Sequence, residues 1–266
     1  MTENERKRTK MIGGVEEKML SEERQKIILE MLESKGSVEG TELMAALDAS
    51  ESTIRRDLNA MDEAGLLTKV HGGAIAKTKQ SYITLDRDLE QKRGLHTEEK
   101  KKIAAYAASL ITDDDFVYMD AGTTTELMID FIEAKNATFV TNAINNARLL
   151  SQKGCKTFLL GGEFKSVTEA IVGEEAIANI EKYNFTKGFF GVNGITKKNG
   201  YTTPEMKEAM IKKKAMLSSK DAYVLADSSK FGEISPVCFN AIQAAEIITE
   251  FCPKEFEDLQ NVIVVK

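Results

Sequence analysis

The sequence predicts an α/β protein of two domains, an N-terminal winged helix-turn-helix and a C-terminal open α/β sheet. Three observations support this fold class. Short amphipathic helical patterns precede a glycine-rich hairpin, strand-like runs alternate with helical patterns after residue 97, and 266 residues suffice for both domains. We expect an N-terminal extension over 1–18, the winged helix over 19–74, a linker over 75–96 and the α/β domain over 97–266.

Three helices and a hairpin make up the predicted first domain. Residues 1–18 are polar without periodicity, and Met19 offers a second start, so we interpret 1–18 as a disordered or mis-assigned extension. Apolar spacing predicts helices over about 21–35, 40–47 and 50–65. Residues 66–70 then alternate as a strand, and Gly72-Gly73 permits a tight reversal.

The third helix contains the most informative stretch, which runs from Ser50 through Glu-Ser-Thr-Ile-Arg-Arg-Asp to Leu58. Ser50 can cap the free backbone N–H groups of its first turn. Ile54, Leu58 and Met61 follow the spacing of one inward face. The residues between them must therefore point outward near the beginning of the helix.

These outward residues are of the types that read a DNA major groove, with Ser/Thr for phosphates and Arg for guanine edges. A generic three-helix module for protein contacts is the alternative, but it would not need paired arginines beside Ser/Thr. We expect DNA contacts from Ser50, Ser52, Thr53, Arg55 and Arg56. Lys69 and His71, in the hairpin that forms the wing, are expected to reach the sugar-phosphate backbone of the DNA.

Charge complicates this interpretation, because the formal net charge is −6 and acidic residues outnumber basic ones even over 19–80. The acids gather in the first helix, whereas the basic residues lie on the third helix and beyond it. Phosphate attraction depends on the local face. We therefore expect modest affinity for each copy and a homo-oligomer on double-stranded operator DNA.

Composition excludes several other classes. No apolar run approaches the ~20 residues of a membrane span, and no signal peptide is evident. Cys155, Cys238 and Cys252 lack CxxC spacing, and there are only 2 histidines, so neither a disulfide framework nor a metal site is predicted. We expect a cytoplasmic protein without a cofactor.

The second domain is predicted from alternating strands and helices, which indicate an open sheet covered on both faces. A helix is expected over 98–111. The predicted strands span 116–119, 138–140, 157–160, 188–192, 223–226, 246–249 and 262–265. The predicted helices between them span 126–133, 145–153, 175–180 and 204–218.

Several loops would end at one edge of this sheet. Ala121 to Thr125, between a strand and a helix, offers glycine and three hydroxyls as an anion cradle. It lacks the Gly-Lys-Ser/Thr of a Walker loop, so a nucleoside triphosphate is not expected. Turn formation explains each of these loops alone, yet together they suit a sugar phosphate. The candidate effector residues are Asp120, Gly122, Thr123, Thr124, Thr125, Thr141, Asn142, Gly161, Gly162, Asn193, Gly194 and Lys230.

Three charged runs need no ligand. We interpret Lys100 to Lys102 and Lys212 to Lys214 as solvated helix faces. Asp113 to Asp115 lacks the spacing of a calcium loop and is expected to be a turn.

These motifs resemble the DeoR family of bacterial transcriptional regulators over residues 19–266. The resemblance rests on 50–58, 65–66 and 70–74 in the first domain, and on 120–125, 141–142, 161–162, 191–194 and 227–232 in the second. It implies a repressor whose sensor domain binds a phosphorylated sugar. Within the family, 202–204 and 230–235 resemble repressors of fructose-utilisation operons, which implies fructose 1-phosphate as the inducer.

The second domain is also similar to ribose-5-phosphate isomerase, which suggests an alternative: an isomerase-like enzyme with an added DNA-binding module. Those enzymes carry an Asp-Gly-Ala-Asp-Glu stretch where this chain has Phe190-Gly-Val-Asn-Gly194. A phenyl ring and an amide cannot act as acid or base near neutral pH. Glu205 and Glu208 remain possible bases, but we expect no catalytic residue and no enzyme activity.

Overall fold

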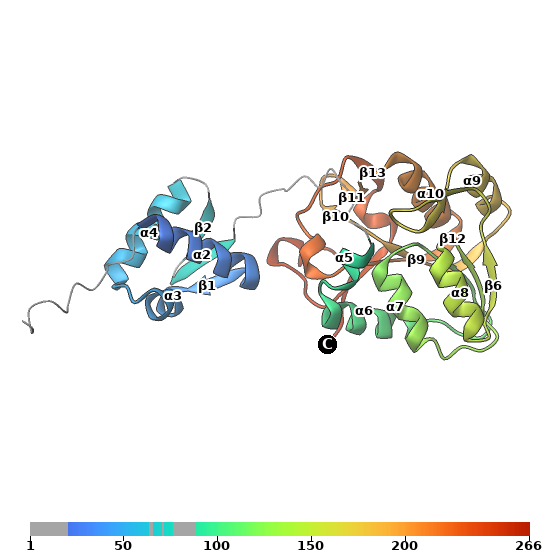
Figure 1. Ribbon diagram of the computed structural model, residues 1–266, viewed down its shortest axis with the longest axis horizontal. Helices are drawn as coiled ribbons and strands as arrows, with labels where there is room; N and C mark the ends of the chain where they lie inside the picture. Colours follow the sequence, from blue (N-terminus) through green and yellow to red (C-terminus); the bar gives the residue numbers. More distant parts are fainter. Residues whose placement is uncertain (1–20, 64–65, 71, 77–88) are drawn as a thin grey trace, which may run out of the picture. The chain divides into compact units, whose positions relative to one another are not determined.

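The computed structural model describes residues 21–63, 66–70, 72–76 and 89–266 (Figure 1). The chain divides into two compact units, 1–78 and 79–266. The expected extension over 1–18 and most of the expected linker lie outside the described residues. Ile75 and Ala76 belong to a strand of the first unit, and the described chain resumes at Leu89. No helix in the described ranges is both long and apolar enough to span a membrane.

The first unit is a winged helix. Its helices are α2 (Ser21–Lys35), α3 (Gly40–Leu47) and α4 (Glu51–Glu63), and its strands are β1 (Ser37–Glu39), β2 (Leu67–Val70) and β3 (Gly73–Ala76). The strands form an antiparallel sheet in the order β1-β3-β2. Apolar residues from all three helices, among them Ile28, Leu43 and Leu58, pack into one core. The predicted helices are therefore observed, with α2 and α3 at their predicted bounds.

Strand β1 was not predicted, because its three residues are too few to show a period. It is held by a close approach of backbones. A Cβ at Gly73 of β3 would lie 2.2 Å from the carbonyl oxygen of Val38, so only glycine fits there. Gly36, with φ of +72°, ends α2 and directs the chain into this strand.

The second unit contains a seven-stranded sheet in the order β15-β14-β12-β9-β4-β5-β6, with every neighbouring pair parallel. Its strands are β4 (Phe116–Met119), β5 (Thr138–Thr141), β6 (Lys156–Leu159), β9 (Phe185–Gly191), β12 (Ser219–Leu225), β14 (Glu246–Thr249) and β15 (Val262–Val264). This arrangement confirms the predicted open α/β fold.

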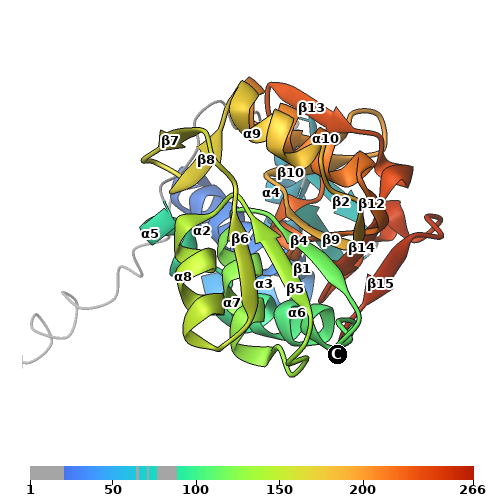
Figure 2. The same ribbon diagram turned by 90° about the vertical axis from the view of Figure 1, so that its right-hand side faces the viewer.

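Helices cover both faces of this sheet (Figure 2). The helices are α6 (Thr97–Ser109), α7 (Thr123–Phe131), α8 (Ile144–Gln152), α9 (Glu174–Ile180) and α10 (Met206–Leu217). Val117 and Met119 of β4 pack in a core with α6, α7 and α8, whereas Tyr118 between them packs in a core with α9 and α10. The alternation of side chains along one strand thus divides the core into two layers.

Smaller elements surround the carboxyl edge of the sheet. They are α5 (Leu89–Arg93), the hairpin β7 (Glu163–Lys165) and β8 (Ala170–Val172), the sheet of β10 (Gly194–Thr196), β11 (Gly200–Thr203) and β13 (Val237–Asn240), and the 3-10 helices η1 (Ser228–Lys230) and η3 (Lys254–Phe256). A further 3-10 helix, η2 (Ile242–Ala244), leads into the amino end of β14. None of these strands was predicted, since each is short and pairs with a segment whose sequence gives no sign of it.

The strand order reverses between β4 and β9, which lie side by side at the centre of the sheet. From β4 the chain proceeds to β5 and β6 in one direction, and from β9 to β12, β14 and β15 in the other. Ligands of open α/β sheets bind outside the carboxyl ends of strands at such a reversal. The topology therefore places the loops after β4, β9 and β12 around one position.

Candidate functional site

Helix α4 presents its two arginines to solvent. Ser50 caps it, because the Ser50 Oγ accepts a hydrogen bond of 3.3 Å from the backbone N–H of Thr53. Ile54 is 3% exposed on the inward side, whereas Arg55 and Arg56 are exposed on the outward side. The helix therefore offers two guanidinium groups beside its N-terminal hydroxyls, an arrangement suited to a phosphate-lined groove.

A buried ion pair fixes α4 to α2. Asp57 is only 4% exposed, and its carboxylate accepts hydrogen bonds from Arg24 Nε at 2.7 Å and Nη2 at 3.2 Å, and from Ser21 Oγ at 3.1 Å. Sequence reasoning assigned Asp57 no role. Its position three residues after Ile54, on the inward face, was the available signal.

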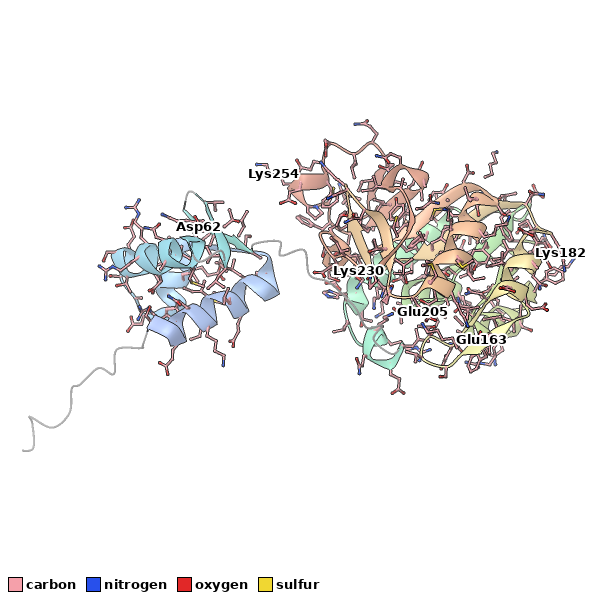
Figure 3. All side chains as sticks on the ribbon, turned by 90° about the horizontal axis from the view of Figure 1, so that it is seen from above. Asp62, Glu163, Lys182, Glu205, Lys230 and Lys254 are labelled. Carbon is pink, nitrogen blue, oxygen red and sulfur yellow. The ribbon has the colours of Figure 1, made fainter. Side chains whose placement is uncertain are left out.

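The wing is attached to the same helix. The Lys69 Nζ of β2 donates a hydrogen bond of 2.6 Å to the Asn59 side chain, and the Lys69 N–H donates at 3.4 Å to Asp62, which lies exposed on α4 (Figure 3). Arg55 and Lys69 line one hollow between α3, α4 and the wing. His71 lies outside the described residues.

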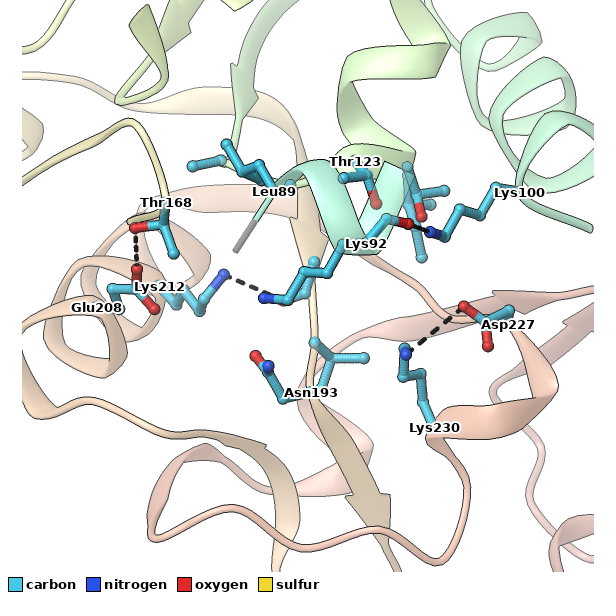
Figure 4. Close-up of a pocket in the computed structure, with 16 residues that line it drawn as sticks. Leu89, Lys92, Lys100, Thr123, Thr168, Asn193, Glu208, Lys212, Asp227 and Lys230 are labelled. Atoms are coloured by element: carbon cyan, nitrogen blue, oxygen red, sulfur yellow. Dashed lines mark hydrogen bonds and ion pairs between the residues drawn. The ribbon is translucent and has the colours of Figure 1, made fainter. Parts of the chain in front are cut away.

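The second unit holds a cavity of about 80 Å3 at the carboxyl ends of β4, β9 and β12 (Figure 4). It is lined by Leu89, Lys92, Lys100, Ala121, Gly122, Thr123, Thr124, Thr168, Gly191, Val192, Asn193, Glu208, Lys212, Leu225, Asp227 and Lys230. Five of these were predicted from the sequence: Gly122, Thr123, Thr124, Asn193 and Lys230.

Cationic groups surround one end of this cavity. Lys100 of α6 is 4% exposed, and burial lowers the pKa of its amine. Lys230 lies opposite, with its Nζ 3.8 Å from a carboxylate oxygen of Asp227. Helix α7 begins at the same place and has no side-chain cap. Because Thr123 and Thr124 form its first turn, their N–H groups and the helix dipole suit an anion.

A carboxylate occupies the other end. Glu208 of α10 accepts hydrogen bonds from Thr168 Oγ1 at 2.6 Å and Lys165 Nζ at 3.0 Å through one oxygen, and from Thr203 Oγ1 at 3.4 Å through the other. Burial acts to raise the pKa of Glu208, but Lys212, Thr168 and Lys165 outweigh it and lower the pKa overall. Glu208 is therefore an ionised group facing the cavity.

Asp120, which we expected to face a sugar, lies beneath the cavity. It is 1% exposed and forms an ion pair with Lys212 Nζ, and it also accepts a 3.0 Å hydrogen bond from the Gly191 N–H. Burial raises the pKa of Asp120, and the charge of Lys212 offsets part of this effect. The pair joins the end of β4 to α10 under the cavity.

Three predicted polar residues serve the loops around the cavity and do not line it. Thr125 Oγ1 donates to backbone carbonyls within its own turn, and Thr141 Oγ1 accepts from the next loop. Asn142 accepts a 3.1 Å hydrogen bond from the Tyr118 hydroxyl and another from the Ala121 N–H. These side chains shape the anion cradle from behind.

The remaining predicted glycines also lie apart from the cavity lining. A Cβ at Gly162 would meet the backbone oxygen of Val172 at 2.8 Å, and one at Gly194 would meet that of Glu233 at 2.2 Å. Gly162 and Gly194 therefore permit close backbone contacts. Gly161, in the β6–β7 connection, has no such contact, since a Cβ there would meet only the Asn179 side chain, at 3.9 Å.

Sequence reasoning gave no effector role to several polar residues that line the cavity, among them Lys92, Lys100, Thr168 and Lys212, and it considered Glu208 only as a possible base. The interpretation of Lys100 and Lys212 as solvated was wrong, since they are 4% and 5% exposed. Both lie at helical spacing from inward apolar residues, and that spacing was the available signal.

A winged helix with exposed arginines, together with an α/β domain that surrounds an anion-suited cavity, defines a ligand-responsive DNA-binding regulator. The comparisons with known families agree. A family profile described as the DeoR-like helix-turn-helix domain matches residues 24–80, and the DeoR C terminal sensor domain matches 95–250. The chain belongs to the DeoR family of transcriptional regulators.

Relatives cover nearly the whole chain. An uncharacterized HTH-type transcriptional regulator FruR of Bacillus subtilis strain 168 is 44% identical over 250 residues, 93% of this chain and 98% of that protein. A lactose phosphotransferase system repressor of Streptococcus mutans serotype c is 35% identical over 236 residues, covering 87% and 93%. These relatives are regulators, and this chain is a transcriptional regulator and not an enzyme.

Solved structures with a similar α/β fold include a ribose 5-phosphate isomerase from Methanocaldococcus jannaschii. It is 17% identical with a TM-score of 0.36, over 50% of this chain and 53% of that one. The similarity is one of fold.

Proposed function

We propose that this protein is a cytoplasmic, homo-oligomeric repressor of a fructose-utilisation operon, released from its operator by fructose 1-phosphate. The named relatives, a FruR-type regulator and repressors of a lactose phosphotransferase system, support control of sugar uptake genes. The observation that carries the effector assignment is the convergence of Lys100, Lys230 and the first turn of α7 on one cavity.

On the DNA side, the exposed arginines of α4 support direct contact with base edges. Arg55 and Arg56 would enter the major groove, while Ser50, Ser52 and Thr53 at the helix N-terminus would hold phosphates. Lys69 and His71 would reach the backbone from the wing. Paired half-sites on a homo-oligomer would multiply these contacts, which compensates for the acidic net charge.

In the pocket, the phosphate would bind against the N–H groups of Thr123 and Thr124, between the amines of Lys100 and Lys230. Such charge-assisted hydrogen bonds are among the stronger ones in proteins. Asn193 would meet the sugar hydroxyls, and Asp120 would act from below by fixing Lys212.

Helix α5 supports a route from the pocket to the DNA-binding unit. It is the first described element after β3, and its Leu89 and Lys92 line the cavity. The Lys100 Nζ donates a hydrogen bond to the Lys92 backbone oxygen. A phosphate that takes the Lys100 amine therefore competes with the bond that holds α5.

The small volume of the cavity also supports displacement of α5. A cavity of about 80 Å3 corresponds to the liquid volume of roughly three water molecules, and Lys92 extends across it (Figure 4). A phosphorylated hexose would have to displace the Lys92 side chain, and with it α5. Because a ligand shifts only those states that it binds unequally, this displacement is the difference that the effector would exploit.

The test is fluorescence anisotropy of a labelled duplex taken from upstream of the chain's own gene, titrated with the protein at fixed salt. We expect fructose 1-phosphate to release the DNA, and fructose or inorganic phosphate alone to be ineffective. Release by a different sugar phosphate would keep the repressor and change the effector. Tight binding that no sugar phosphate alters would contradict the sensor assignment.

Lys230→Ala locates the phosphate. This variant should bind the duplex as the wild type does, yet need at least about tenfold more effector for release, because one charge-assisted hydrogen bond is lost. Lys182→Ala, which removes a surface lysine remote from the cavity lining, is the control. A normal response of the Lys230 variant would show that the phosphate binds elsewhere.

A further inference from the structure

The two ends of the cavity carry charged groups of opposite sign. Lys100 and Lys230 stand at one end, while Glu208 and the hydroxyl of Thr168 stand at the other (Figure 4). Asn193 lies between them. A single cavity thus offers cations to one part of a ligand and an acceptor of hydrogen bonds to the other.

The carboxylate of Glu208 keeps capacity for a ligand. Its Oε1 already accepts the short bonds from Thr168 and Lys165, whereas Oε2 has only the 3.4 Å contact with Thr203 among the described side chains. A carboxylate oxygen accepts more than one hydrogen bond and donates none when ionised. The far end of the cavity therefore suits donors such as hydroxyl groups.

Nearby cations do not offset this preference, because they are already paired. Lys165 bonds to both Glu205 and Glu208, and Lys212 bonds to Asp120 beneath the cavity floor. The side chain of Lys92 also extends across the cavity (Figure 4), but a phosphorylated hexose would displace it together with α5. The opposite end has two lysine amines against the single carboxylate of Asp227.

We infer that the pocket is specific for sugars with one phosphate, and that Glu208 is the residue that excludes a second anionic group at the far end. This inference rests on the proposed function and deepens it. The phosphate binds at the Lys100 end, and the hydroxyl groups of the sugar donate to Glu208. A ligand with phosphates at both ends would bring the second one against a buried carboxylate, and like charges in contact oppose binding strongly.

Fructose 1-phosphate and fructose 1,6-bisphosphate form the test pair, since they differ only in the second phosphate. The chain has no tryptophan, so binding to the full-length protein is measured by isothermal titration calorimetry. We expect the monophosphate to bind at least about tenfold more tightly than the bisphosphate. Equal affinities, or a preference for the bisphosphate, would overturn the inference while leaving a sugar-phosphate sensor in place.

Glu208→Gln identifies the residue responsible. The amide is similar in size but uncharged, so affinity for the bisphosphate should rise and affinity for the monophosphate should fall, by several-fold each. Glu205→Gln is the matched control, because it also loses a carboxylate partner of Lys165 but does not line the cavity. Its selectivity should equal that of the wild type.

The readout is the ratio of the two dissociation constants, which general destabilisation would leave unchanged. If the ratio in Glu208→Gln stays at the wild-type value, Glu208 is not the specificity residue. If that variant does not fold, Thr168→Val, which removes one donor that orients Glu208, should change the ratio, and an unchanged ratio there contradicts the inference. If neither sugar phosphate binds the wild type, the proposed function itself fails.

Discussion

The arginines of α4 project into solvent, whereas three charged groups that line the cavity of the second unit are buried. Arg55 and Arg56 are exposed, while Lys100, Glu208 and Lys212 are 4%, 8% and 5% exposed. DNA is a large polyanion that a protein meets with its outer surface. A small ligand must be enclosed, and the enclosing charges then need partners within the fold.

The difference has a consequence for mutation. Removal of an exposed arginine changes binding and leaves folding nearly intact, whereas removal of a buried charge leaves its partner desolvated and costs stability. Each of the following variants tests whether exposed and buried charges differ in this way. The largest effect is expected at the one charged residue of α4 that the structure shows to be buried, because the arginines of this helix are exposed.

Asp57→Ala removes this buried charge. Loss of the carboxylate that accepts from Arg24 and Ser21 should cost about 3 kcal/mol of unfolding free energy. In a unit of this size we expect loss of operator binding through unfolding, with sugar-phosphate binding by the second unit retained. Circular dichroism melting with calorimetric titration measures both. Asp62→Ala, at an exposed position on the same helix, should change stability by less than about 0.5 kcal/mol; equal effects of the two would remove the distinction.

Asp115→Asn applies the same idea to the second unit. Asp115 is 7% exposed and accepts hydrogen bonds of 2.6 Å from both Lys187 and Thr186. Burial acts to raise its pKa, but these bonds outweigh burial and lower the pKa from 3.8 to about 2. The carboxylate therefore contributes about 2 kcal/mol at neutral pH.

The sign of the pH dependence follows from that shift. A depressed folded-state pKa stabilises the protein above the unfolded value of 3.8, and this stability is lost as pH falls toward about 2. Urea unfolding at pH 7 should show Asp115→Asn less stable than wild type, with the gap closing toward pH 2. Asp114→Asn, at the exposed neighbouring position, is the control. A gap that persists unchanged in acid would show that the hydrogen bonds do not depend on ionisation.

Local periodicity predicted the parts of the fold that a single segment determines. The bounds of α2 and α3, the cap at Ser50 and the inward face of α4 all follow from spacing within one helix. The strands of the large sheet were also found, because buried parallel strands are nearly continuous apolar runs. Helix α7 begins at Thr123 and not at Glu126 as predicted, which places the threonines in its first turn.

The cavity was predicted only in part, for a physical reason. Loop residues at strand ends, such as Asn193 and Lys230, can be located from topology alone. For Lys212 the spacing within α10 was a signal, but its burial depends on Asp120, which lies 92 positions away in the sequence. A run of lysines on a helix looks solvated until the partner that compensates one of them is known. The contacts of Glu208 with Lys165 and Thr168 pose the same problem.

Arg56→Ala tests the exposed side of the comparison. Loss of a guanidinium that contacts a base should weaken operator binding by about 1–3 kcal/mol, with the melting temperature unchanged. Arg56→Lys keeps the charge but not the planar fork, so it should restore binding to nonspecific DNA more than to the operator. Anisotropy with operator and scrambled duplexes at equal salt measures this. Unchanged operator affinity in Arg56→Ala would refute the assignment of α4 as the reading helix.

Arg93→Ala concerns a residue between these extremes, and its effect should be the smallest. Arg93 of α5 forms a bidentate pair with Glu126 at 3.2 and 3.0 Å and lies 3.7 Å from Glu169. Its side chain is 37% exposed, so the interaction is worth less than about 1 kcal/mol. Because this pair holds α5 in its effector-free position, its loss should ease the displacement by ligand. Half-maximal release of operator should then occur at about two- to fivefold lower effector concentration.

The control for this variant is Arg148→Ala, which removes a guanidinium of α8 whose hydrogen bonds to described residues stay within its own helix, to Asn145 and Gln152. Its release curve should overlay that of the wild type. A shift of the Arg93 curve to higher effector concentration would mean that α5 must stay anchored to transmit the signal. An unshifted curve would show that α5 does not connect the pocket to the DNA, and that the buried and exposed charges communicate by another path.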